Sequence, residues 1–168
     1  MEQSILAALY RYNNYANQLV LETAARLTVD EFTQRSSPSR ESAHILLRHL
    51  LATETFFLRS CQAQAMPPDL NQLVTVADLQ DYQQMLAHDQ ATFIQTLTDI
   101  DLQREIDFQI GPQPLHLPMW QLLMQAFVHS AHHRGELSIV LSQLGHPLPT
   151  LDIIIPLVEW NGQVWPGK

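Results

Sequence analysis

Apolar residues recur at helical spacing over four long stretches of this chain, and that periodicity constrains the fold more than any other feature of the sequence. The stretches cover residues 4–27, 38–64, 77–99 and 118–145. Only five of the 168 residues are glycine, and one of them, Gly145, stands where the last stretch would naturally stop. Four long helices with one longer excursion predict an all-α four-helix bundle.

Local signals indicate where individual helices begin. Thr28-Val-Asp-Glu31 has the form of a capping box and predicts a short helical turn as far as about Gln34. Thr75-Val-Ala-Asp78 marks the start of the third long helix in the same way. Ser37 can cap the second long helix, with Pro38 in its first position. We therefore expect the second helix to begin at Pro38.

The periodicity changes ahead of the last long helix. Apolar and polar residues alternate over 106–110 and again over 115–117, on either side of Gly111-Pro-Gln-Pro114. This pattern predicts a small β-hairpin or an extended crossover. The tail beyond the last long helix is apolar over residues 152–158 and is expected to fray from Trp160 onward.

The balance of charge limits the classes of partner. Nine lysines and arginines stand against 17 aspartates and glutamates, which gives a net charge of −8. The few basic residues are spread thinly and make no footprint for nucleic acid or for an anionic membrane. No segment approaches the roughly 18 uninterrupted apolar residues of a transmembrane helix. We expect neither a nucleic-acid partner nor a membrane partner.

Length and cysteine content indicate one domain in a reducing compartment. The chain has 168 residues, 46% of them hydrophobic, which suffices for a single domain with its own core over residues 1–168. Cys61 is the only cysteine, so no intramolecular disulfide can form. The N-terminal residues lack the positive region and apolar run of a signal peptide. We therefore expect a soluble cytoplasmic protein.

Two histidines interrupt the apolar face of the last long helix. At about 100° per residue, His129 and His133 lie one turn apart on a single face. The same face carries Leu122, Ala126, Leu137, Val140 and Leu144. Buried imidazoles cost free energy unless they are satisfied, and a metal ion would satisfy a pair at this spacing.

A third ligand must then come from another helix, and His49 is the strongest candidate. It shares a helix face with the apolar residues of the second long stretch, whereas His44 points about 140° away. Three neutral imidazoles that leave coordination positions open are typical of a catalytic metal site. Such a metal lowers the pKa of a bound water or thiol and creates a nucleophile at neutral pH. Spacing alone also fits ordinary core histidines held by hydrogen bonds.

Neighbouring polar residues have more than one interpretation. His132 lies about 100° from His133 and is expected to orient a neighbour or to face solvent. Glu136 could accept a hydrogen bond from a ligand histidine, act as a general base, or lie on the helix surface. Cys61 is expected to be a buried small residue, because a catalytic thiol needs a basic neighbour.

Several motifs together resemble one known family. Tyr10-Arg-Tyr-Asn-Asn-Tyr-Ala-Asn17 is similar to its first-helix pattern, and His49-Leu-Leu-Ala-Thr-Glu54 to its second-helix histidine with an acidic residue five positions later. His129-Ser-Ala-His-His-Arg-Gly-Glu136 is similar to its His-x-x-His-His-Arg-Gly-Gln signature, and Gly145 with Leu151-Asp152 fits its usual close. Over nearly its whole length the chain resembles the DinB-like (DinB/YfiT) superfamily of metal-dependent proteins.

The resemblance implies an up-down-down-up four-helix bundle, often a homodimer, that holds a divalent metal. The metal is commonly nickel or zinc, and by position its ligands are His49, His129 and His133. Glu136 and Glu54 are then candidates to support these ligands. Glu136 departs from the family pattern, which usually has glutamine there. Some relatives are transferases that use a low-molecular-weight thiol such as bacillithiol, mycothiol or glutathione.

Two functions follow from these patterns. The first is a metal-dependent enzyme, a thiol-dependent S-transferase or a hydrolase, acting on a small-molecule electrophile. The sequence identifies no further catalytic or substrate-binding motif. The second is a non-enzymatic helical stress-response or binding protein, whose histidines form a vestigial or structural metal site.

Overall fold

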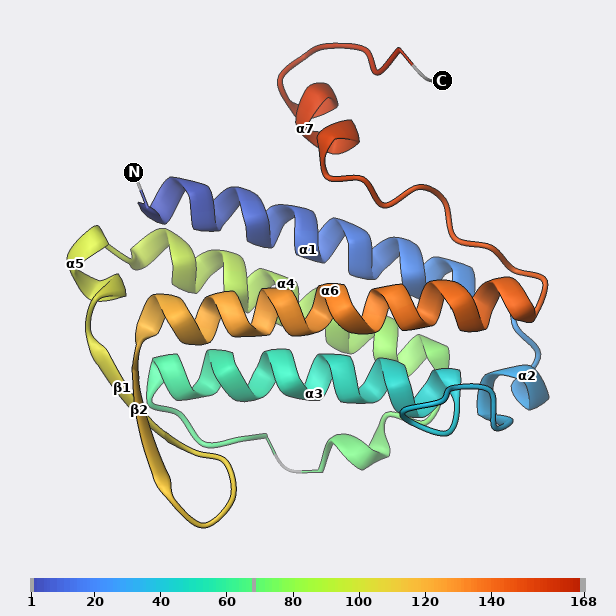
Figure 1. Ribbon diagram of the computed structural model, residues 1–168, viewed down its shortest axis with the longest axis horizontal. Helices are drawn as coiled ribbons and strands as arrows, with labels where there is room; N and C mark the ends of the chain where they lie inside the picture. The colour runs from blue at the N-terminus through green and yellow to red at the C-terminus, as the bar shows by residue number, and fades with distance from the viewer. Residues whose placement is uncertain (1, 68, 167–168) are drawn as a thin grey trace.

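The computed structural model describes residues 2–67 and 69–166 and is mostly helical. Four long helices lie side by side, as Figure 1 shows. They are α1 (Glu2–Ala24), α3 (Ala43–Gln62), α4 (Val76–Thr96) and α6 (Met119–Gln143). The most extensive packing joins α3 to α6 and α1 to α4, and further packing joins α1 to α6 and α3 to α4. Among the described residues, no helix is both long enough and apolar enough to cross a membrane.

Short elements connect the long helices. They are α2 (Val29–Thr33), the 3-10 helix η1 (Leu70–Gln72), α5 (Asp99–Leu102), β1 (Glu105–Gln109), β2 (Pro114–Pro118) and α7 (Ile154–Trp160). The two strands pair antiparallel, with Glu105 opposite Pro118 and Gln109 opposite Pro114. This hairpin confirms the prediction made from the alternating pattern.

Side-chain hydrogen bonds cap the first residues of several helices. Thr28 and Thr75 each form the predicted capping box. The threonine side chain accepts a hydrogen bond from the backbone amide three residues later, and the acidic side chain there accepts one from the threonine amide. The second long helix begins later than predicted, because Ser42 rather than Ser37 caps it by accepting a hydrogen bond from the Ile45 amide. The prediction of a helix from residue 38 was therefore wrong. Residues 37–41 instead form a tight loop, in which Glu41 takes a φ of 73°.

The tail is more ordered than its composition suggested. Its apolar residues form α7 up to Trp160, and Figure 1 shows this helix set apart from the four long ones. The Trp160 ring lies edge-on to Tyr15, with 6.1 Å between ring centroids, and the Arg11 guanidinium lies 3.9 Å from the indole centroid. These contacts attach the tail to α1.

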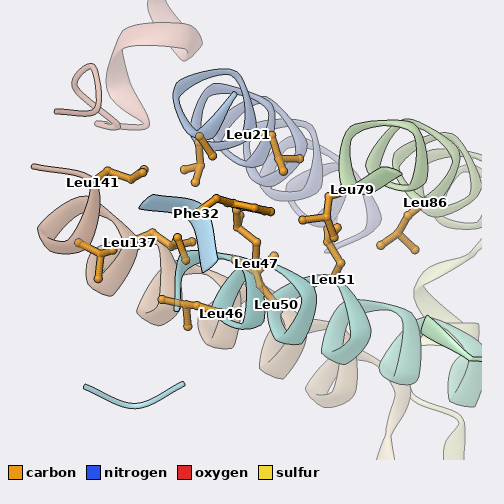
Figure 2. Packing of buried hydrophobic residues seen from close by; sticks show 14 of the residues in the cluster. Leu21, Phe32, Leu46, Leu47, Leu50, Leu51, Leu79, Leu86, Leu137 and Leu141 are labelled. Carbon is orange, nitrogen blue, oxygen red and sulfur yellow. The ribbon is translucent and has the colours of Figure 1, made fainter. Parts of the chain in front are cut away.

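The apolar core consists of two clusters along the long helices. Figure 2 shows the first cluster, which is rich in leucine from α3, α4 and α6, including Leu50, Leu79 and Leu137. The second lies nearer the hairpin and includes Phe57 and Met119. Burial of each such side chain contributes about 1.5–3 kcal/mol to folding. The tight packing of α3 on α6 fixes the relative position of the histidines on those two helices.

Candidate metal centre

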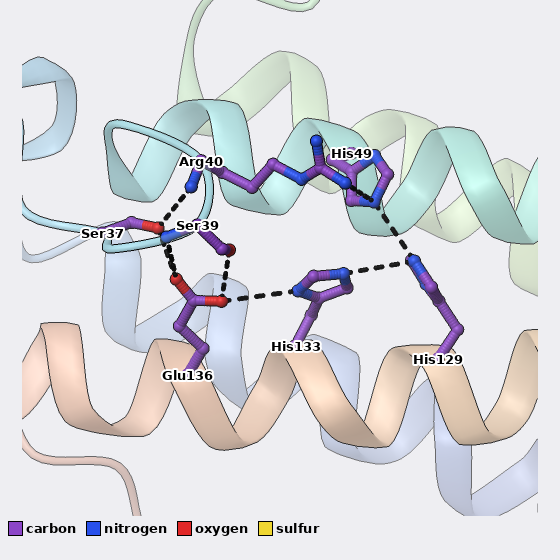
Figure 3. Close-up of polar contacts among 7 residues, drawn as sticks. All are labelled: Ser37, Ser39, Arg40, His49, His129, His133 and Glu136. Carbon is purple, nitrogen blue, oxygen red and sulfur yellow. Dashed lines mark hydrogen bonds and ion pairs between the residues drawn. The ribbon is translucent and has the colours of Figure 1, made fainter.

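Three histidines from α3 and α6 converge on one point, as Figure 3 shows. The Nε2 atoms of His49 and His129 lie 3.1 Å apart, and so do those of His129 and His133. One nitrogen from each of the three rings lies within 4.8 Å of the others. The structure therefore brings together the three residues that helix-face spacing and the family resemblance selected.

These rings cannot satisfy one another by hydrogen bonds alone. Arg40 Nη2 lies 3.0 Å from His49 Nε2. Because a guanidinium can only donate, His49 Nε2 must accept this hydrogen bond. His129 Nε2 would then supply a single hydrogen to two neighbours at 3.1 Å. Among the described residues, the buried Nδ1 atoms of His129 and His133 have no hydrogen-bond partner. The cluster does not match a fully hydrogen-bonded set of core histidines.

The donor set fits a divalent metal ion. Nitrogen ligands bound at 2.0–2.1 Å in a tetrahedral site lie about 3.3 Å from one another, close to the observed Nε2 separations. Imidazole is a common ligand of zinc and nickel. A cation would accept an electron pair from each nitrogen, and no hydrogen would be needed between them.

Electrostatics keep the rings neutral, which is the state that binds metal. Burial, followed by the nearby Arg40 and His133, lowers the pKa of His49 from its ordinary 6.5 to about 4. Burial and the neighbouring His133 and His49 lower the pKa of His129 to about 4 as well. The pKa of His133 is also lowered, chiefly by burial, although the Glu136 carboxylate opposes that shift. All three rings are therefore competent ligands at neutral pH.

Glu136 joins the histidines to the loop that precedes α3. Its Oε1 accepts hydrogen bonds from Ser37 Oγ at 2.5 Å and from the Ser39 amide at 3.1 Å, and its Oε2 accepts one from Ser39 Oγ at 2.5 Å. Oε2 also lies 3.6 Å from His133 Nδ1, which is an electrostatic contact rather than a hydrogen bond. Although burial opposes the shift, the serine hydrogen bonds and His133 lower the Glu136 pKa. An ionised carboxylate therefore faces the outer nitrogen of one candidate ligand.

The same loop brings Arg40 to the site. Its backbone amide donates to Ser37 Oγ at 2.9 Å, while its exposed side chain reaches His49. Sequence reasoning missed Arg40, Ser37 and Ser39, because they lie outside the long helices and no periodicity relates them to the histidines. The predicted helix from residue 38 would also have placed Ser39 and Arg40 in a helical turn, whereas both lie in the loop before α3.

Comparison with known proteins identifies the chain's relatives. A model of the DinB family matches residues 1–159. The chain belongs to the DinB family. Among its relatives is the uncharacterized protein YjoA of Bacillus subtilis, which is 25% identical over 145 residues, covering 84% of this chain and 90% of YjoA. The crystal structure of that DinB-like protein has a TM-score of 0.64 and 21% identity, covering 86% of this chain and 97% of its own, and it supports the fold alone.

Glu54 does not reach the histidines in this DinB protein. Its Oε1 accepts hydrogen bonds from Asn13 and Asn17 at 2.8 Å each and from Ser130 at 2.6 Å. Its Oε2 accepts one from Gln90 at 2.8 Å. The side chain is thus engaged in a buried polar network that joins α1, α3, α4 and α6, and none of these four hydrogen bonds is to a candidate ligand.

Arg134 completes that network from the helix that carries the histidine pair. Its Nη1 donates to Asn13 Oδ1 at 2.6 Å and to Asn17 Oδ1 at 2.7 Å, so the two asparagines bridge the cation to the Glu54 carboxylate. Arg134 is only 3% exposed. Burial lowers the Arg134 pKa, and Glu54 opposes that shift. This arginine, which follows His133 in the chain, therefore has structural partners separate from the histidine cluster.

Other candidates from the sequence lie outside the cluster. His132 is exposed, and its ring centroid lies 5.0 Å from that of His133. His44 makes a 2.7 Å contact to the Leu73 carbonyl and packs against Phe32. Burial raises the pKa of the Cys61 thiol to about 12, which makes it unsuited to be a nucleophile. These positions agree with the expectations for His132, His44 and Cys61.

Proposed function

We propose that this DinB protein is a metal-dependent enzyme in which His49, His129 and His133 hold one divalent ion, nickel or zinc. The observation that carries the proposal is the convergence of three neutral Nε2 atoms with too few hydrogens to satisfy their contacts. Membership of the DinB family adds support, because the residues around His49, His129 and His133 resemble the histidine motifs of that family.

The reaction we propose is attack on a small electrophile by a thiol, as in an S-transferase, or by water, as in a hydrolase. Three protein ligands leave coordination positions open, and a metal bound there lowers the pKa of a thiol or water so that it is a nucleophile at neutral pH. The chain's own residues keep the three rings unprotonated, and Glu136 faces His133 Nδ1 and favours a proton on that outer nitrogen.

Fold topology, assembly and location form part of the same proposal. We propose the up-down-down-up bundle of the family, supported by α1 and α6 running in one direction in Figure 1 and α3 and α4 in the other.

We propose a homodimer, because Ile5 is 57% exposed and Trp120 39% exposed beside an apolar hollow of about 360 Å³. Sedimentation equilibrium tests the dimer. We propose a cytoplasmic location, which localisation of the tagged chain in cells tests.

Metal analysis tests the proposed centre. Protein purified without a histidine tag is expected to contain about one equivalent of nickel or zinc, and His49→Ala and His133→Ala should each lose it. His132→Ala is the matched control, because His132 lies on the same helix but is exposed. Unchanged metal content in both ligand variants would contradict the proposal.

One observation favours the non-enzymatic alternative, in which the histidines are a vestigial or structural site. Arg40 donates to His49 Nε2, and that contact uses the electron pair that a metal would need. If the site is vestigial and binds no metal, added zinc or nickel leaves the melting temperature unchanged. Under the metal-centre proposal, added metal raises it, because binding to the folded state alone stabilises that state.

A further inference from the structure

A cavity of about 390 Å³ adjoins the histidine cluster and has two arginines in its wall. Arg40 and Arg48 line it together with His49. Within residues 2–67 and 69–166, no carboxylate forms an ion pair with either guanidinium. The protein as a whole carries a net charge of −8, so a cavity lined by two arginines without ion-pair partners differs in charge from the rest of the molecule.

One acidic residue shares this cavity. Asp69 also lines the cavity, and its Oδ1 accepts a hydrogen bond from the Asn71 amide at 3.0 Å, which caps η1. The formal charge of the lining is still positive, with two guanidinium groups and one carboxylate. The cavity can therefore receive an anionic group beside the metal centre.

The Arg40 backbone is held firmly, although its side chain is exposed. Its amide donates to Ser37 Oγ, and Ser37 is only 5% exposed and itself donates to Glu136. Figure 3 shows the resulting chain of contacts from Glu136 through the loop to Arg40 and His49. Arg40 is therefore anchored beside the centre, while its guanidinium can turn.

A metal ion and the present Arg40 contact compete for one electron pair. A guanidinium hydrogen bonded to His49 Nε2 occupies the lone pair that a ligand bond requires, and two cations at that point also repel each other. When metal binds, Arg40 must leave Nε2. The cavity that Arg40 already lines is the space open to it, where Arg48 also lies.

We infer that the small molecule bound at the metal carries a carboxylate, which Arg40 and Arg48 receive in this cavity. The inference rests on the proposed metal centre. It adds that the substrate or the thiol bound at this centre is an anion. The planar guanidinium fork binds carboxylates through two parallel hydrogen bonds, so an arginine pair in a cavity that His49 also lines favours a ligand with an acid group. Arg40 and Arg48 are then residues that bind and orient the ligand.

Binding of two matched thiols to Co²⁺-loaded protein tests this inference. The probes are 3-mercaptopropionate and its neutral analogue 3-mercaptopropionamide, each titrated while the thiolate-to-cobalt absorption is recorded. Wild-type protein is expected to bind the carboxylate probe about ten- to a hundredfold more tightly than the amide. The double variant Arg40→Ala/Arg48→Ala should bind the two probes equally. Arg35→Ala, an exposed arginine near the same loop, is the control and should keep the preference.

The outcomes separate this inference from the proposed metal centre. Equal binding of the two probes by wild-type protein, or a preference that survives in the double variant, overturns the inference while leaving the centre intact. Failure of Co²⁺ alone to bind the wild-type protein overturns both. Arg40→Ala by itself should bind Co²⁺ at least as tightly as wild type, because it removes the competitor for His49; weaker binding would contradict the competition on which the inference depends.

Discussion

Glu136 Oε2 lies 3.6 Å from His133 Nδ1 and at the same time accepts a hydrogen bond from Ser39 Oγ at 2.5 Å. One carboxylate therefore faces the outer nitrogen of a candidate metal ligand and fastens the loop that carries Arg40. Its position one turn from His133 on α6 makes both contacts possible.

Replacing Glu136 by alanine is expected to release this loop. Three hydrogen bonds to an ionised acceptor are lost, so the free energy of unfolding should fall by about 1–3 kcal/mol. Hydrogen exchange gives the sharper readout, because the Ser39 amide donates to Glu136 and should lose its protection. Glu105→Ala, on the exposed edge of the hairpin, is the control and should leave Ser39 unchanged. Persistent protection of the Ser39 amide would show that the loop is held by other contacts.

Removing the Glu54 carboxylate is expected to destabilise the fold without removing the histidine cluster. Glu54→Ala leaves four buried donors without their acceptor and Arg134 without its counter-charge, which should cost about 3–5 kcal/mol in urea unfolding. Glu54→Gln keeps the shape and should cost less. A loss below about 1 kcal/mol in Glu54→Ala would mean that the network contributes little to stability.

Metal content separates a structural role of Glu54 from a role at the centre. Because the four hydrogen bonds of Glu54 are to Asn13, Asn17, Gln90 and Ser130 and not to a histidine, folded Glu54→Gln protein should retain as much metal as wild type. Loss of metal from a Glu54→Gln protein that is still folded would place this carboxylate in the metal site after all.

The stability of the metal-free protein is expected to fall as the pH decreases from about 6.5 toward about 4. The pKa values of His49 and His129 are lowered to about 4 in the folded state, against an ordinary value of 6.5. Between these values the unfolded chain binds more protons than the folded one, so acid favours unfolding. Above pH 6.5 the two rings are neutral in both the folded and the unfolded state, so their full contribution to the free energy of unfolding is present.

Urea midpoints measured across that pH window test the linkage. The variant His49→Ala/His129→Ala should lose less stability between pH 6.5 and 4 than wild type, because it lacks both titrating rings. His116→Ala is the control, since His116 lies exposed on the hairpin beside Asp107. Identical pH profiles for wild type and the double variant would contradict the lowered pKa values.

Trp160→Ala is expected to release α7 from α1. The substitution removes the edge-on contact with Tyr15 and the stacking of Arg11, worth about 1 kcal/mol together at a partly exposed site. Limited proteolysis should then cut the tail faster, while urea unfolding of the long helices changes little. An unchanged cleavage rate would indicate that the tail is attached by other residues.

The long helices and the three histidines could be predicted because both depend on one local rule. Helical periodicity places His129 and His133 on one face whatever the rest of the chain does, and it turns His49 inward on α3. The capping boxes at Thr28 and Thr75 are local for the same reason. Signals that act within a few residues need no knowledge of the tertiary structure.

The remaining features depend on contacts between distant residues. Ser37 resembles a helix cap, but its hydroxyl is bound by Glu136, 99 positions along the chain, and Ser42 caps α3 instead. Arg40 contacts His49 only because Glu136 and Ser37 hold the loop before α3 in its observed conformation. The tail was predicted to fray at Trp160, yet that side chain contacts Tyr15 and Arg11 in the first helix. Tertiary contacts override local propensity at each of these positions.

Crystals of the tag-free protein grown with zinc or nickel, with anomalous scattering measured at the edge of that metal, test the central claim most directly. The account predicts one strong anomalous peak bounded by the Nε2 atoms of His49, His129 and His133, with the Arg40 guanidinium moved away from His49. The absence of a peak there, with Arg40 still hydrogen bonded to His49 Nε2, would contradict it.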